Sequence, residues 1–206
     1  MISLEFLLAS LVVVLVPGTG VIYTVSTGRL RGRRASVFAS LGCALGILPH
    51  LAATVLGLAA VLHASALAFQ LLKFAGALYL LYMAVVTWRD RSAFAVNADL
   101  GGSSTTEGAH VLQAFLLNIL NPKLTIFFLA YLPQFVDPAR GEPLWQMLAL
   151  GAVFMAMTFG VFVVYGLAAH GFRRHVIGSL RLQQGLRVGF SAAFAALGTR
   201  LALSDR

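Results

Sequence analysis

The sequence contains little charge: 11% of its 206 residues are Asp, Glu, Lys or Arg, whereas 59% are hydrophobic. Soluble domains contain about 25% charged residues, which solvate their surface. A water-soluble globule of this composition would have too few polar side chains to cover it. The composition therefore excludes soluble enzymes, secreted modules and disordered chains, and it indicates an integral membrane protein.

Cysteine is also scarce, since Cys43 is the only one. A single thiol cannot form an internal disulfide or a dithiol redox pair, and it argues against a thiolate metal site. Acidic residues are missing from the interior of every apolar segment, so a hard cation would find no carboxylate there. The sequence has neither His-Glu-x-x-His nor Gly-x-Ser-x-Gly. We expect no metal, no cofactor and no enzymatic activity.

The apolar segments predict six membrane-spanning helices. One span needs about 20 apolar residues. The segments are 6–28, two spans over 35–88 with a turn near 63–65, 110–136, about 145–169, and about 186–204. The last is the weakest, and its alternative is a helix lying on the membrane surface. The polar stretch 89–109 is expected to be a loop.

The net charge of +8 is better explained by membrane orientation than by a nucleic-acid partner. Ten arginines fall in or beside the loops that follow spans 1, 3 and 5, and three fall on the other side. The ten are Arg29, Arg31, Arg33, Arg34, Arg89, Arg91, Arg173, Arg174, Arg181 and Arg187. Basic loops remain in the cytoplasm, so both termini are predicted to face outward.

Helix breakers fall at matching places in the two halves of the chain. Pro17-Gly18-Thr19-Gly20 interrupts the first span, and Asn121-Pro122-Lys123 interrupts the fourth. Three spans per half is an odd number, so the second half must be inserted upside down. We therefore predict one all-α membrane domain over 1–206, built as two inverted three-helix repeats with broken helices 1 and 4. Repeat A covers about 1–88, the loop about 89–109, and repeat B about 110–206. The alternative is that both prolines are plain kinks.

Interrupted helices at corresponding positions are typical of inverted-repeat transporters, whose substrate site lies at the midplane between them. Freed backbone groups are costly in lipid and must face protein or a water-filled cavity. A zwitterion suits such a site, because its carboxylate can meet a helix N-terminus and its ammonium can meet freed carbonyls. The predicted walls are Pro17, Gly18, Thr19 and Gly20 on one side, and Asn118, Asn121, Pro122 and Lys123 on the other.

Lys123 is the main functional candidate, because a lysine in the middle of a membrane helix is expensive. It either binds the substrate carboxylate or ties the helix ends together by holding carbonyls of the opposite broken helix. The amides of Asn118 and Asn121 can likewise bind substrate or satisfy the broken backbone.

Other polar residues are secondary candidates. Tyr79 either lines the cavity or packs at an interface, and His50 is either a proton-coupling residue or a hydrogen-bonded packing histidine. Lys73 is a candidate for coupling or gating, with snorkelling as its alternative. Tyr131, Gln134 and Asp137, toward the outer end of span 4, are candidates for a gate.

Three blocks of residues carry a family resemblance. They are Val16-Pro17-Gly18-Thr19-Gly20 with Gly32-Arg33-Arg34 and 41–46; Leu72-Lys73-Phe74-Ala75-Gly76 through Leu80; and Asn118, Asn121-Pro122-Lys123 and 132–138. In these blocks the sequence resembles the LysE/RhtB amino-acid exporters of bacteria. The resemblance implies an inner-membrane exporter of amino acids or close derivatives, driven by proton exchange. Family members carry Pro-Gly-Pro in the first block, where this chain has Thr19.

These observations together predict an exporter of neutral zwitterionic amino acids that works by proton-coupled alternating access. Its expected partners are the amino acid, protons and the lipid bilayer. Small residues near 185–196 allow packing within one subunit or in a homo-oligomer. The alternatives are a transporter of another small ion or metabolite, a membrane-embedded enzyme, and a membrane subunit that transports nothing.

Overall fold

The computed structural model describes residues 2–16, 18–64, 66–89, 106–137, 141–169 and 180–203. These ranges contain helices and no strand. Pro17, most of the predicted 89–109 loop and the connection before the last helix lie outside them. The first half comprises α1 (Leu4–Leu15), α2 (Thr19–Leu30), α3 (Arg33–Leu45), α4 (Leu48–Ala64) and α5 (Ala66–Arg89). The second half comprises α6 (Glu107–Ile119), α7 (Pro122–Ile126), a π turn η2 (Phe127–Tyr131), a 3-10 turn η3 (Leu132–Phe135), α8 (Pro143–Leu167) and α10 (Leu180–Leu203).

The first predicted interruption is present. The Ser3 hydroxyl caps α1 by accepting a hydrogen bond from Phe6 N at 3.1 Å. The helix ends at Leu15, and Val16 is extended, with ψ of 120°, as expected for a residue that precedes proline. Helix α2 then starts at Thr19, and the axes of α1 and α2 differ by 57°.

The second interruption is present too. Helix α6 ends at Ile119, and Asn121 is extended, with ψ of 105°. The Asn121 side chain accepts a hydrogen bond from Lys123 N at 3.1 Å and so caps α7. Pro122 occupies the first helical turn, where its missing N–H costs nothing. The two parts of this segment are bent by 56°, which matches the first break.

Helices of membrane-spanning length and composition number two among the described residues, Arg33–Gly57 and Pro143–Leu167. If each bent pair counts as one span, the number rises to four. Helices α5 and α10 are 24 residues long each but lie outside this set. Six spans therefore remain a prediction. The last helix starts at Leu180, earlier than the expected residue 186.

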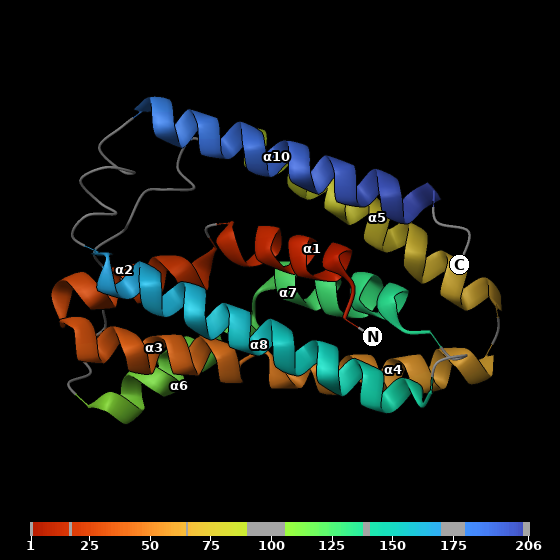
Figure 1. Cartoon of the computed structure of the whole chain (residues 1–206), viewed down its shortest axis with the longest axis horizontal. Helices are drawn as coiled ribbons and strands as arrows, with labels where there is room; N and C mark the ends of the chain where they lie inside the picture. The colour runs from red at the N-terminus through yellow and green to blue at the C-terminus, as the bar shows by residue number, and fades with distance from the viewer. Residues whose placement is uncertain are drawn as a thin grey trace.

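The helices run along one long axis (Figure 1). Helices α5 and α10 pack side by side, and α3 packs between α6 and α8. Glu5 of α1 pairs with Arg200 of α10 at 2.5 Å, so the beginning of α1 and the end of α10 lie together. The arginine-rich turn between α2 and α3 is at the other end of the molecule, where Arg34 pairs with Glu107 at 2.6 Å.

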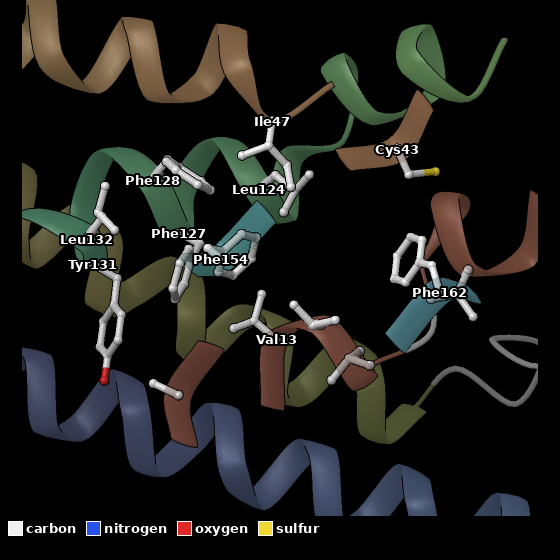
Figure 2. Close-up of a cluster of buried hydrophobic side chains, with 14 of the residues drawn as sticks. Val13, Cys43, Ile47, Leu124, Phe127, Phe128, Tyr131, Leu132, Phe154 and Phe162 are labelled. Carbon is white, nitrogen blue, oxygen red and sulfur yellow. The ribbon is translucent and has the colours of Figure 1, made fainter. Parts of the chain in front are cut away.

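An aromatic cluster fills the centre beside the second break. The ring centroids of Phe127 and Phe154 lie 4.8 Å apart, and those of Phe128 and Phe154 lie 5.2 Å apart. Figure 2 shows these rings beside Leu124, with Phe162 and Cys43 at the opposite side of the cluster. Rings packed in this way hold η2 and α8 in a fixed relation beside the break.

Close backbone contact between α3 and α6 gives the first prediction. A Cβ at Gly42 would overlap the Val111 carbonyl and lie 2.8 Å from Ala114 Cβ, whereas a Cβ at Gly160 would meet nothing within 4 Å. We expect Gly42→Ala to lower the thermal unfolding midpoint of the detergent-purified protein. Gly160→Ala should leave the midpoint unchanged or raise it, because alanine stabilises a helix by about 1 kcal/mol relative to glycine. Equal midpoints for the two variants would contradict the packing.

Candidate functional site

The two helix breaks lie against each other. Gly18, the N-terminal cap of α2, faces the side chains that follow the other break: a Cβ built at Gly18 would lie 3.5 Å from Lys123 Nζ and 3.7 Å from Asn121 Nδ2. The structure therefore brings together residues from both predicted walls, although their sequence positions are about half the chain apart.

Lys123 joins the second break to the first. Its Nζ donates to Val13 O at 2.8 Å and to Val16 O at 2.9 Å. These carbonyls belong to the last turn of α1, where the helix itself supplies no donor. The negative end of the α1 dipole also favours the ammonium charge. Lys123 has no acidic partner within the described part of the chain. This geometry matches one of the two roles predicted for Lys123, a tie that joins the helix ends.

A third carbonyl at the same helix end is also bonded. Tyr165 of α8 donates its hydroxyl hydrogen to Leu15 O at 3.1 Å. The end of α1 is thus held by side chains from α7 and α8, so the interruption is stabilised by the other half of the protein.

The end of α6 receives donors in the same way. Thr19, the first residue of α2, donates to Leu117 O at 3.5 Å. His50 of α4 lies with Nε2 at 3.1 Å from Asn118 O. The two breaks are therefore reciprocal: the residues that begin the second part of each broken segment donate to the carbonyls that end the first part of the other.

Asn118 lies one turn before the second break and has a structural bond. Its Nδ2 donates to Cys43 O at 2.5 Å, and the side chain is 1% exposed. Its Oδ1 lies beside Gly20, where a Cβ would be 3.1 Å away, and the ring of Phe162 leaves even less room. Gly20 is thus needed for the close approach of α2 to α6 and α8, and Asn118 fixes α6 to α3.

His50 and Thr125 connect the two sides of the second break. His50 Nδ1 lies 3.4 Å from Thr125 Oγ1, and the same hydroxyl lies 3.3 Å from Asn121 O. His50 therefore contacts the last turn of α6 through one ring nitrogen and the first turn of α7 through the other.

Hydrogen-bond donors converge on the start of α2. Gly18 provides no side-chain cap, and the first bond of the helix is from Ile22 N to Gly18 O at 3.0 Å. The preceding N–H groups of the turn therefore have no partner within the helix. Asn121 is 8% exposed, and its Nδ2 makes no hydrogen bond to any described residue. Together with the Lys123 ammonium, these donors form a site suited to a carboxylate.

The structure also describes the surroundings of three further predicted residues. Tyr79 contacts Tyr82 on the same helix, with centroids 5.8 Å apart. Lys73 is buried, with Nζ 5.0 Å from the centroid of Phe74, rather than extended to the surface. Pro122 occupies the first turn of α7 and is exposed.

The gate candidates lie near the end of the molecule that carries the termini. Tyr131 packs on Phe135, with centroids 5.1 Å apart, and Phe135 meets Phe6 of α1 at 5.3 Å. Gln134 lies in the same 3-10 turn. The backbone of Asp137 is bonded to Gln146 of α8, which donates to Asp137 O at 2.8 Å. These residues thus link η3 to α1 and α8.

Thr125, Tyr165 and the hydrogen bonds around Tyr23 were not predicted from the sequence. The Tyr23 hydroxyl lies 3.1 Å from His110 Nδ1 and 3.1 Å from Gln113 Oε1, which joins α2 to the start of α6. His110 could have been recognised as a candidate, because it is a histidine at the start of an apolar segment. Tyr165 could not, since its partner at Leu15 is distant in sequence.

Apolar helices that are interrupted at matching positions in two halves of the chain are typical of membrane transport proteins. The chain belongs to the LysE type translocator family, whose model matches residues 11–205.

Among its relatives is the homoserine/homoserine lactone efflux protein of Salmonella typhimurium, which is 30% identical over 96% of this chain and 94% of the relative. An uncharacterized membrane protein of Vibrio cholerae is 35% identical over 81% of this chain and 78% of its own. The leucine efflux protein of an Enterobacter strain is 27% identical over 76% of each chain. No solved structure matches the chain.

The Lys123 tie predicts an order of stability. Lys123→Met leaves the Val13 and Val16 carbonyls without their donor, and each unsatisfied buried group costs about 1–3 kcal/mol. Tyr165→Phe removes the donor to one carbonyl of this helix end, Leu15 O. We expect the thermal unfolding midpoint in detergent to fall more for Lys123→Met than for Tyr165→Phe. A Lys123→Met protein as stable as the wild type would show that the tie has no structural role.

Proposed function

We propose that this protein exports neutral zwitterionic amino acids across the bacterial inner membrane by proton-coupled alternating access. The translocator family and the efflux proteins among its relatives support amino-acid export in general. The observation that carries the finer proposal is the position of Lys123, an ammonium without an acidic partner in the described structure, at the junction of two matched helix breaks.

The substrate carboxylate binds at the start of α2. The Lys123 ammonium, the Asn121 amide and the free N–H groups after Gly18 all donate toward this position. Thr19 is exposed beside it and Gly18 is partly exposed, so a ligand can reach the site. Charge-assisted hydrogen bonds from several donors are the strong kind that holds a carboxylate.

The substrate ammonium binds at the end of α6. Leu117 O accepts there from Thr19, and Asn118 O accepts from His50 and from Asn121 N at 3.1 Å. Carbonyl dipoles at a helix C-terminus favour a cation. Because no carboxylate lies in this part of the described structure, a substrate with an additional positive charge gains no ionic partner. This arrangement favours neutral amino acids.

The helix pairing supports alternating access between inverted repeats. The second segments of the two halves, α3 and α8, pack together, as do the third segments, α5 and α10. The proposed topology has six spans, with both termini in the periplasm and the arginine-rich end in the cytoplasm. Each half then moves around the breaks as a unit.

Access at the end that carries the termini is closed by a gate of Phe6, Tyr131 and Phe135, covered by the Glu5–Arg200 ion pair. The gate joins α1 and α10 to η2 and η3. Substrate release requires the separation of these contacts.

Efflux from proteoliposomes that contain the purified protein tests the proposal. We expect release of labelled homoserine and leucine, accelerated by an inward proton gradient. Homoserine lactone has no free carboxylate, so it should compete at least about tenfold less well than homoserine, which is the loss of about 1.4 kcal/mol. Failure of folded protein to move any amino acid would refute export, and equal competition by the lactone would refute the carboxylate site.

Lys123→Gln should abolish the preference for homoserine over its lactone, because it removes the ammonium but keeps a donor. Arg33→Gln is the matched control: it removes one positive charge from an exposed position at the arginine-rich end, and it should retain the preference. Loss of the preference in both variants would show that overall charge, rather than the Lys123 position, determines selectivity.

A further inference from the structure

The tautomer of His50 follows from its partners. Nε2 lies 3.1 Å from Asn118 O, and a carbonyl oxygen only accepts, so Nε2 carries a hydrogen. Nδ1 lies 3.4 Å from the Thr125 hydroxyl, which can both donate and accept. One nitrogen of this ring is therefore fixed as a donor, and the other is free to gain or lose a proton.

The Thr125 hydroxyl has two acceptors to choose between. When His50 is neutral, the hydroxyl hydrogen can point to Nδ1. When Nδ1 is protonated, it can donate to Thr125 Oγ1, and the hydroxyl hydrogen can turn to Asn121 O at 3.3 Å. The ring thus keeps both of its hydrogen bonds whether it is neutral or protonated. A histidine with only a packing role would not need partners for both protonation states.

The surroundings of His50 contain few titratable groups. The side chain is 6% exposed. The elements that pack on α4 contribute Lys73, Tyr79, Tyr82 and Arg89 on α5, Tyr131 on η2 and Tyr165 on α8, and α7 contributes Lys123. Glu107 and His110 lie in the N-terminal part of α6, away from the end that His50 contacts. None of the groups on these neighbours of α4 or on α7 is a carboxylate, so the imidazole has no anionic partner there within the described structure.

We propose that His50 carries the proton that is exchanged for the amino acid, and that Thr125 is the hydroxyl that switches with it. This inference rests on the proposed function. In each cycle one proton enters from the outside, binds Nδ1 of His50 and leaves to the cytoplasm, while one zwitterion moves outward. The N–H bond that forms at Nδ1 when the proton enters breaks again when the proton leaves, so His50 returns to its starting state after each cycle.

Competition at the end of α6 gives the exchange its direction. His50 donates to Asn118 O, which is also a carbonyl proposed for the substrate ammonium. An imidazolium and an ammonium repel each other when they share one acceptor site. Proton binding and substrate binding therefore disfavour each other, as antiport requires and symport does not.

Two transport modes separate coupling from binding. Exchange of labelled for unlabelled amino acid needs no net proton movement, whereas accumulation driven by a pH gradient does. We expect His50→Gln to retain exchange, because glutamine can still donate to Asn118 O, and to lose gradient-driven accumulation. The matched control is His110→Gln, which changes the other buried histidine of the described chain, bonded to Tyr23, and should retain both modes.

Retention of gradient-driven accumulation by His50→Gln overturns the inference, and its loss in His110→Gln alone assigns the proton to the other histidine. If His50→Gln loses both modes, Thr125 decides. Thr125→Val removes the switching hydroxyl and should shift the pH dependence of exchange, while Thr125→Ser should keep the wild-type profile. Identical profiles for valine and wild type overturn the inference.

A measurement independent of transport is the ring-nitrogen NMR shift of His50 across neutral pH, assigned by comparison with His50→Gln. We expect a titration in the wild type that is displaced in Thr125→Val. A ring that stays in one state over this range overturns the inference even where amino-acid transport is confirmed. A titrating ring in a protein that moves no amino acid would instead refute the proposed function.

Discussion

The structure depends on the need to satisfy backbone carbonyls where two apolar helices stop. The core of a bilayer contains no water that could donate hydrogen bonds to these carbonyls, and each unpaired backbone group costs several kcal/mol. At the end of α1 the need is met by Lys123 and Tyr165, and at the end of α6 by Thr19 and His50. The position of the breaks, their polar neighbours and the packing of α8 against α1 all follow from this requirement.

The donors come from across the molecule rather than from the broken helix itself. Lys123 belongs to the second half and holds the first, and Thr19 belongs to the first half and contacts the second. A movement of one half against the other must therefore replace these donors with other groups. A zwitterion can do so, because its ammonium donates where Thr19 and His50 now donate, and its carboxylate offers Lys123 another acceptor. In the proposed function, binding and movement are thereby linked through the same few carbonyls.

The sequence predicted the features that come from local chemistry. Pro17 and Pro122 predicted the interruptions, and a lysine within an apolar segment predicted the candidate site. Proline and lysine are both energetically costly inside a membrane helix, so the residue type alone is informative. The contacts of Tyr165 and Thr125 could not be predicted, since a tyrosine or threonine in a membrane helix is cheap and its partner is set by packing. The π turn at Phe127–Tyr131 likewise follows from the aromatic contacts with Phe154. For Tyr79 the sequence left a cavity role and a packing role open, and in the structure its ring contacts Tyr82 on the same helix.

The use of carbonyls in place of carboxylates has a consequence for selectivity. A buried carboxylate would attract any cation strongly and would itself require compensation, which makes release slow. Carbonyl dipoles at a helix end attract a cation more weakly than a carboxylate does, and here they already accept from hydroxyl and imidazole donors. A bound ammonium would therefore replace these donors rather than add new hydrogen bonds. Among the described residues, the fixed charge at the breaks is the Lys123 ammonium, which the end of α1 stabilises and which repels cationic side chains of a substrate. Under the proposed function, such a site would distinguish substrates by the pairing of one carboxylate with one ammonium, and apolar groups such as Phe162 beside Gly20 would face the rest of the amino acid.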